Sequence, residues 1–431
     1  MVNMPYIFYE ILDIFHKASF FALSLQAVLV ILVIWLILHK NKNNEKTKNL
    51  TAQEKADLIA NWNPEPLVGD TPLDHPSLSP RLVTSRVGKR ITVDGWDCLN
   101  LGTHNYLGLL EDDGIQEDAI RSLKKYGVGS CGPRGFYGTT DVHLELEEKL
   151  AQFMDMEEAV VYSDEAANFA IQKGLDASRC TVIYFRHNDM KDLEEKLIEH
   201  TRQAAKNPKK AAKTRKFLIA EGIYMNTGEM CPLADLVALR KRYQLRFFLD
   251  ESITFGTMGA TGRGLTEHLG IDRAEIDLIS ATLEWAVGTI GGFCVGSSFI
   301  VDHQRLSGLG YCFSASCPPL LTRAAVSALE KFDKEPELFA EIQECSRKLQ
   351  RLHLYVREEK ATKAEDALLT EIVDKCITKG LCLVKAQYLQ HIEKKCPRPS
   401  IRITVNRLLT DEDMAFTFRT LESISKEVLL Q

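Results

Sequence analysis

The sequence predicts a membrane-anchored α/β protein, in which a domain with a mainly parallel sheet precedes a smaller α+β domain. Short runs rich in β-branched and aromatic residues alternate with segments of helical periodicity across residues 159–296, a pattern typical of βαβ units. An uncharged segment near the N-terminus is long enough to cross a bilayer. With 431 residues, of which 45% are hydrophobic and 26% charged, the chain can bury a large core, and its composition excludes a wholly disordered or multi-span protein.

The uncharged segment, residues 18–38, is expected to form a transmembrane helix. At a rise of about 1.5 Å per residue, it would span roughly 30 Å, the thickness of one hydrocarbon core. A cleaved signal peptide is the alternative. However, the apolar run is longer than that of a signal peptide, and the lysine-rich sequence HKNKNNEKTK follows it instead of a small-residue cleavage site.

The lysines around this segment predict its orientation. They are concentrated just after it, whereas Lys17 is the only cation before it. Because positive charge favours the cytosolic side, we expect residues 1–17 to be lumenal and the rest of the chain to be cytosolic. Asn49 begins the only N-glycosylation sequon, and a glycan there would reverse this topology.

After the anchor, the chain is expected to form a linker and two domains. Residues 39–80 are polar and then proline-rich, which predicts a linker arm. A large α/β domain is expected over residues 81–320 and a small C-terminal α+β domain over residues 321–431. Helices are predicted over 142–154 and 321–357, and strands over 159–162, 181–185, 216–223, 245–250, 277–282, 291–296 and, in the small domain, 400–405.

Charge and cysteine content exclude further classes. The chain carries 53 Lys and Arg against 59 Asp and Glu, so it has no overall basic character and nucleic acid is not an expected partner. Its 11 cysteines form no C-x-x-C pair and have no companion histidine cluster, so we expect reduced thiols and no metal site.

Six segments, in order along residues 80–430, resemble the α-oxoamine synthases. This family contains pyridoxal-phosphate (PLP) enzymes that join an amino acid to an acyl-CoA with loss of CO2. The resemblance implies a large domain with the PLP-transferase-like fold, followed by the small domain. The segments are NYLGL at 105–109, GVGSCGPRGFYGTTDVHLELEEKLAQF at 127–153, EGIYMNTGEMCPL at 221–233, GATGRGLTEHLG at 259–270, GYCFSASCPPLL at 310–321 and IRITV at 401–405.

The resemblance also implies that this chain lacks the family's cofactor-binding lysine. That lysine follows a threonine by three residues, and here Thr282 is followed by Trp285 at the lysine position. The ring-stacking histidine falls on Asn168. Asp250 is retained where the family has the acid that faces the pyridine nitrogen, so Asp250 and Thr282 are residual cofactor contacts. We therefore expect no catalytic residue here and no covalently bound cofactor.

Further departures surround these positions. A family histidine is replaced by Ile253, and the serine that contacts the cofactor falls on Met225. Arg402 matches the arginine that pairs with a substrate carboxylate, and without a bound substrate it is expected to be residual or structural.

In this family the active site is built from both subunits of a dimer, so a chain with an inactive site can complete its partner's. Two segments match those that cross the interface. They would supply Cys131, Gly132, Ser314 and Ser316. The alternative interpretation is an ordinary glycine turn and two serines that cap a helix.

Two segments of the family pattern are missing. Ser163 runs directly into Asp164, where family members carry a strand-edge and helix unit with the phosphate-binding turn, and a second gap falls near residues 349–351. A parallel sheet that loses a strand leaves apolar neighbours uncovered, which threatens stability.

The resemblance thus implies a non-catalytic subunit, inactive alone, that completes and anchors an acyltransferase. Its partner would be a lysine-bearing catalytic subunit that holds PLP, in a heterodimer or larger complex of the endoplasmic reticulum membrane. Small and regulatory membrane subunits are further candidate partners. Two alternatives remain: a shortened regulatory form that binds the partner without supporting turnover, and a self-sufficient PLP acyltransferase, which the missing lysine opposes.

Overall fold

The computed structural model describes most of the chain after residue 78, and parts of what precedes it. The described residues are 28–29, 31–33, 35, 51–62, 79–130, 132–134, 137–154, 163–178, 181–206, 216–296, 298–307, 314–350, 363–388 and 393–429. They belong to two compact units, Met1–Pro80 and Arg81–Gln431.

The first unit contains a short helix within the predicted linker arm. Helix α3 (Ala52–Ala60) begins with a capping box, in which the Thr51 hydroxyl accepts from the Glu54 amide and the Glu54 carboxylate accepts from the Thr51 amide. No helix among the described residues is long and apolar enough to cross a membrane. Most of segment 18–38 lies outside the described residues, as do residues 1–17, so the transmembrane helix stays a prediction.

A six-stranded sheet forms the centre of the second unit, in the order β4-β3-β5-β6-β7-β8. All neighbouring strands are parallel except β7 and β8, which confirms the mainly parallel sheet. Each strand lies within or directly after a predicted apolar run. The strands are β3 (Ser163–Asp164), β4 (Tyr184–Phe185), β5 (Phe217–Glu221), β6 (Arg246–Asp250), β7 (Leu278–Thr282) and β8 (Gly292–Gly296).

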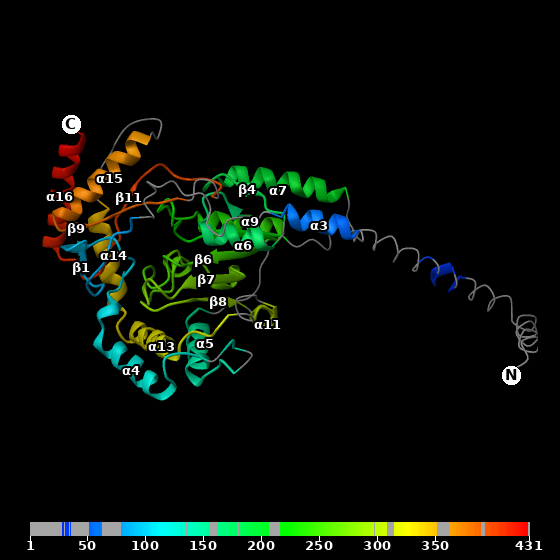
Figure 1. Cartoon of the computed structure of the whole chain (residues 1–431), viewed down its shortest axis with the longest axis horizontal. Coiled ribbons are helices and arrows are strands. Elements are labelled where there is room, and N and C mark those ends of the chain that lie inside the picture. Colours follow the sequence, from blue (N-terminus) through cyan, green and yellow to red (C-terminus); the bar gives the residue numbers. More distant parts are fainter. Residues whose placement is uncertain are drawn as a thin grey trace, which may run out of the picture. The chain divides into compact units, whose positions relative to one another are not determined.

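Helices lie on two sides of these strands. In Figure 1, α6, α7 and α9 lie on one side of β6, β7 and β8, and α4, α5 and α13 lie on the other. The two layers bury one large apolar core with the sheet. The helices of this region are α4 (Asp113–Tyr126), α5 (Asp141–Met154), α6 (Phe169–Ser178), α7 (Met190–Ala205), α9 (Leu233–Tyr243), α10 (Leu265–His268), α11 (Ser298–Ser307) and α13 (Pro319–Lys334), with 3-10 turns η2 (Leu109–Glu111) and η3 (Arg273–Glu275).

A second hydrophobic core lies in the small α+β domain. Strand β2 pairs with β1 and, in parallel, with β9, while β10 pairs with β11. Buried side chains of α14, α15 and α16 pack with these strands. The elements are β1 (Arg90–Val93), β2 (Trp96–Asn100), α14 (Glu337–Leu349), α15 (Lys363–Thr378), β9 (Leu381–Cys382), β10 (Val384–Lys385), β11 (Ile401–Arg402) and α16 (Asp411–Leu429).

The two cores depart from the predicted domain boundary at residue 320. Helix α13 packs with the large core, although most of it follows residue 320, and β1 and β2 belong to the small core, although they lie within the predicted large domain, residues 81–320. The predicted helix over 321–357 is two helices, because Pro336 follows α13 and cannot donate the hydrogen bond that would continue it. Residues 351–362 lie outside the described residues.

Candidate functional site

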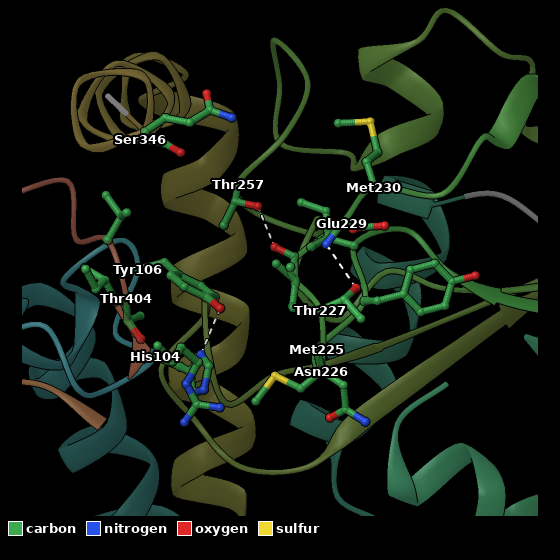
Figure 2. A pocket seen from close by; sticks show the side chains of 18 of the residues that line it. His104, Tyr106, Met225, Asn226, Thr227, Glu229, Met230, Thr257, Ser346 and Thr404 are labelled. Carbon is green, nitrogen blue, oxygen red and sulfur yellow. Dashed lines mark hydrogen bonds between the residues drawn. The ribbon is translucent and has the colours of Figure 1, made fainter. Parts of the chain in front are cut away.

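A cavity of about 1140 Å³ opens between the large sheet and the small domain. Its wall combines the loop after β5, the loop after β6, helix α14 and the segment around β11. Figure 2 shows His104, Tyr106 and Thr404 on one side of it and Met225, Asn226 and Thr227 on the other. The loops at the carboxyl ends of parallel strands are where α/β proteins commonly bind ligands.

Trp285, at the predicted lysine position, is held by two aromatic residues of the cavity wall. Its ring stacks on His104 with centroids 4.6 Å apart and planes inclined by 21°, and meets the edge of the Tyr106 ring at 6.4 Å. The His104 Nδ1 atom lies 2.8 Å from the Tyr106 hydroxyl. Burial, aided by the Arg402 charge, lowers the pKa of His104 to about 4. The indole therefore rests on an uncharged imidazole, with no amine at that position.

The buried carboxyl of Glu221 and the half-buried carboxyl of Asp250 lie side by side at the ends of β5 and β6, because Glu221 pairs with Asp250 in the sheet register. Asp250 accepts from the Ser252 amide at 2.9 Å and from the Ser280 hydroxyl at 3.1 Å. Burial raises the pKa of Asp250. Burial and the charge of Asp250 raise the pKa of Glu221 to about 7. The predicted acid is thus accompanied by a second one.

Asn168 supports the start of helix α6. Its side-chain oxygen accepts from the Ile171 amide at 3.2 Å, while its own backbone amide donates to Glu221 at 2.6 Å. An N-cap of this kind stabilises a helix by about 1 kcal/mol. This arrangement engages the Asn168 side chain as a helix cap at the position where the resemblance places a ring-stacking histidine.

The other predicted positions divide between the cavity and its surroundings. Arg402, Met225 and Ile253 line the cavity. The buried Nε atom of Arg402 has no hydrogen-bond partner among the described residues. Thr282 lies outside the cavity wall, where its hydroxyl accepts from the Glu284 amide at 3.1 Å and donates to the carbonyl of Gly291 at 3.3 Å.

The two segments predicted to face a partner are joined to each other. The amide and hydroxyl of Ser316 both donate to the carbonyl of Gly132 at 3.1 Å. The Ser130 hydroxyl donates back to the carbonyl of Ser316 at 2.7 Å. Ser314 is exposed in the same segment, and Cys131 lies outside the described residues. The structure thus brings Gly132 and Ser316 together.

Sequence reasoning missed His104 and Glu221. His104 directly precedes the NYLGL segment, and Glu221 ends the apolar run of β5. A charged residue at the carboxyl end of a buried parallel strand was the available signal for Glu221. No local signal distinguished His104, because its stacking on Trp285 depends on the tertiary fold.

Comparisons with known proteins agree with this fold. The model of the aminotransferase class I and II family matches residues 96–172 and 169–367. A serine palmitoyltransferase from S. paucimobilis, solved with a bound PLP-myriocin aldimine, superposes with a TM-score of 0.72 at 22% identity and covers 82% of this chain and 94% of its own. This likeness confirms the PLP-transferase-like fold.

Curated relatives specify the family further. Serine palmitoyltransferase 1 of Dictyostelium discoideum is 34% identical over 456 residues, which covers 94% of each chain. Long chain base biosynthesis protein 1 of Arabidopsis thaliana is 32% identical over 460 residues, which covers 96% of this chain and 93% of that protein. The segments HNDM at 187–190 and VDHQRLSG at 301–308, together with Cys131, favour the same subfamily. The chain belongs to the class I and II aminotransferase family and, within it, to the serine palmitoyltransferase 1 family of long-chain-base proteins.

Proposed function

We propose that this chain is the non-catalytic subunit of a serine C-palmitoyltransferase. The complex would condense L-serine with palmitoyl-CoA to 3-oxosphinganine, the first step of sphingolipid synthesis. The observation that carries the proposal is Trp285, which occupies the lysine position and stacks on His104. A chain without that amine cannot hold the cofactor covalently, so it would be inactive alone.

The residues at the family's cofactor positions do not fit PLP. Asn168 is engaged as a helix cap, and Met225 supplies a thioether where the family has a serine. Asp250 is the one acid in place, and its hydrogen bonds go to Ser252 and Ser280. PLP would therefore be held by a lysine-bearing catalytic partner, with this chain supplying the interface and the anchor.

The glycine-rich loop supports a role at a subunit interface. Val128 is 81% exposed and Tyr137 is 99% exposed, so two large apolar side chains flank Gly132 without cover. Tyr137 also has a left-handed backbone with φ of 66°, a conformation that non-glycine residues rarely adopt. Exposed apolar groups and unusual backbone both favour a surface that another subunit covers.

The membrane arrangement belongs to the same proposal. The complex would reside in the endoplasmic reticulum membrane, with residues 18–38 spanning it once, the N-terminus in the lumen and the enzyme domains in the cytosol. Small and regulatory membrane subunits would join the heterodimer there.

One observation favours a second candidate, the shortened regulatory form. The alignments with the Dictyostelium and Arabidopsis relatives extend over 456 and 460 residues, more than the 431 of this chain, so they contain gaps in it. This agrees with the segments missing at 163/164 and near 349–351. A form that lacks them would pair with the catalytic subunit without supporting turnover.

The test is formation of 3-oxosphinganine from labelled serine in membranes that lack the endogenous enzyme. A lysine-bearing catalytic subunit is expressed alone or with this chain, and co-purification is measured in parallel. Activity that requires both chains supports the completing subunit. Co-purification without activity would support the shortened regulatory form instead, and a PLP absorbance band of this chain alone, reducible by borohydride, would establish a self-sufficient enzyme.

A further inference from the structure

A histidine that the proposed function does not yet use contacts both of the segments proposed to face the partner. We infer that His143 is a positioning residue for the partner's active site, acting through the backbone of Cys317. The inference rests on the proposed function, because it assigns the way in which this chain shapes its contribution to the shared site.

His143 lies in the first turn of α5 and is only 3% exposed. Its Nδ1 atom is 2.9 Å from the amide nitrogen of Thr140, and its Nε2 atom is 2.7 Å from the carbonyl oxygen of Cys317. A backbone amide can only donate and a carbonyl can only accept. The ring must therefore accept at Nδ1 and donate at Nε2, which one neutral tautomer does.

The two contacts connect both segments to a rigid element. Thr140 ends the glycine-rich loop, and Cys317 directly follows Ser316, which is bonded to Gly132. Two residues later, the carbonyl of Pro319 accepts from the Ser122 hydroxyl of α4 at 3.0 Å. Along this segment, Ser316 is thus bonded to the glycine-rich loop, Cys317 to α5 and Pro319 to α4.

Among the described residues, the Nε2 contact is the only one of these hydrogen bonds that joins residues 314–319 to α5. Without it, the carbonyl of Cys317 would lose its donor, and the backbone of Ser316 would be held by the loop alone. An acceptor that is shielded from water costs more free energy when it is left without a donor than the hydrogen bond itself contributes, and the Cys317 carbonyl is partly shielded. The segment would then shift, and the exposed Ser314 would shift with it.

The experiment uses two variants of His143, each of which can keep only one of the two contacts made by the imidazole nitrogens. In His143→Asn, the amide reaches about as far as Nδ1, so the contact with Thr140 can be retained while the contact with Cys317 is lost. In His143→Gln, the amide reaches about as far as Nε2, so a donor to Cys317 can be retained. Thr410→Ala is the matched control, because it removes a helix-start hydrogen bond at α16 in the small domain.

Each variant is co-expressed as a full chain with the lysine-bearing subunit, and kcat, KM for both substrates and co-purification are measured. We expect His143→Asn to lower kcat about tenfold, with co-purification retained, because the partly buried hydrogen bond to Cys317 is lost. His143→Gln is expected to stay within about threefold of the wild type, and Thr410→Ala to match the wild type.

Hydrogen–deuterium exchange of the full chain in detergent supplies a readout that needs no turnover. The amide of Ser316 donates to Gly132, so its exchange should be faster in His143→Asn and near wild-type in His143→Gln. A Gln variant no better than the Asn variant in both measurements would overturn the inference, as would loss of co-purification in both. If the wild-type pair shows no turnover, the proposed function fails, and the exchange rates still decide the role of His143.

Discussion

The buried carboxyl of Glu221 makes the stability of the large domain depend on pH, and this dependence can be isolated by one substitution. Glu221 is 2% exposed, and its two oxygens accept from the amides of Asn168 and Met225 at 2.6 and 3.1 Å. Burial and the neighbouring Asp250 nevertheless raise its pKa to about 7 from a usual value of 4.5. Folding therefore favours the protonated form of the Glu221 carboxyl, compared with the unfolded chain.

The sign and size of the effect follow from linkage. A carboxyl whose pKa is raised on folding contributes stability below its unfolded pKa, and this contribution is lost as the pH rises through the folded pKa. At about 1.4 kcal/mol per pH unit, the free energy of unfolding should fall by roughly 3 kcal/mol between pH 4.5 and pH 7 and then level off.

The assay is urea unfolding of the full chain in detergent at several pH values, for the wild type and for Glu221→Gln. Asp250 and Glu251 also have raised pKa values and act in the same direction, so only the difference between the two proteins reports on Glu221. Gln cannot ionise, so the wild type should lose its advantage over the variant as the pH rises. A difference that stays constant from pH 5 to pH 8 would refute the reasoning.

Four further predictions concern the site and the predicted membrane anchor. Trp285→Ala should lower the free energy of unfolding by about 2 kcal/mol, because the stacked pair with His104 is lost from a half-buried position, and urea unfolding measures it. Asn168→Ala should cost about 1 kcal/mol by removing the cap of α6, while partner-dependent turnover stays unchanged. Arg402→Met should leave the KM for serine in the complex unchanged, since the substrate carboxylate would bind in the partner; a rise in KM would contradict this. Asn49 should carry no glycan, as judged by mobility on gels before and after glycosidase treatment, and a shift would reverse the predicted topology.

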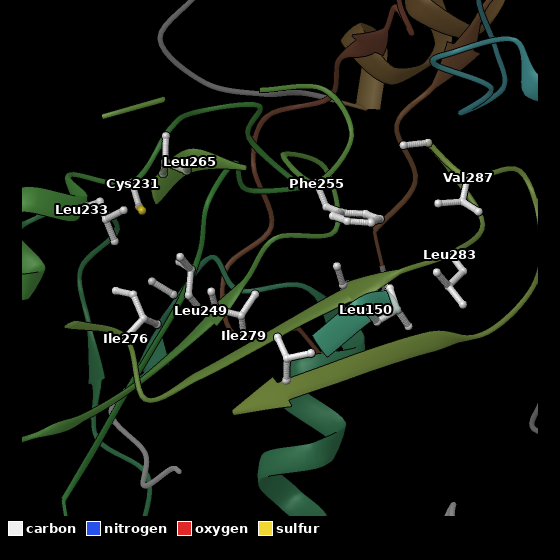
Figure 3. Packing of buried hydrophobic residues seen from close by; sticks show 14 of the residues in the cluster. Leu150, Cys231, Leu233, Leu249, Phe255, Leu265, Ile276, Ile279, Leu283 and Val287 are labelled. Atoms are coloured by element: carbon white, nitrogen blue, oxygen red, sulfur yellow. The ribbon is translucent and has the colours of Figure 1, made fainter. Parts of the chain in front are cut away.

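The inner strands β5 and β7 of the large sheet were predictable because most of their residues are buried. Leu249 and Ile279 lie on neighbouring strands and pack with Phe255 in the same core, as Figure 3 shows. A strand covered on both sides carries a continuous apolar run, which is readable without any knowledge of its neighbours. The same run does not reveal exact ends, so the predicted run at 181–185 forms a strand only at Tyr184–Phe185.

The arrangement of the site was predictable only in part. The family pattern identified Trp285, Asn168 and Arg402, because these depart from or match fixed motif positions. The stacking of Trp285 on His104 joins residues far apart in the chain, and the contact of His143 with Cys317 does the same. Such contacts depend on how distant segments pack, and no local spacing or composition predicts them.

The pairing of β2 with β9 sets an order of events during synthesis. The Cys98 thiol lies against the carbonyl of Ile377, 279 positions later in the chain. At about 5–20 residues per second, a ribosome needs roughly 15 s to 1 min to make the intervening chain. Throughout that interval β1 and β2 can pair with each other, but β9 and the helices of the small core are not yet made. The strands of the large sheet lie between β2 and β9 in the sequence, so that sheet can already form. The early hairpin therefore has an uncovered apolar face during this interval, and this stage is where nascent chains would depend on a chaperone.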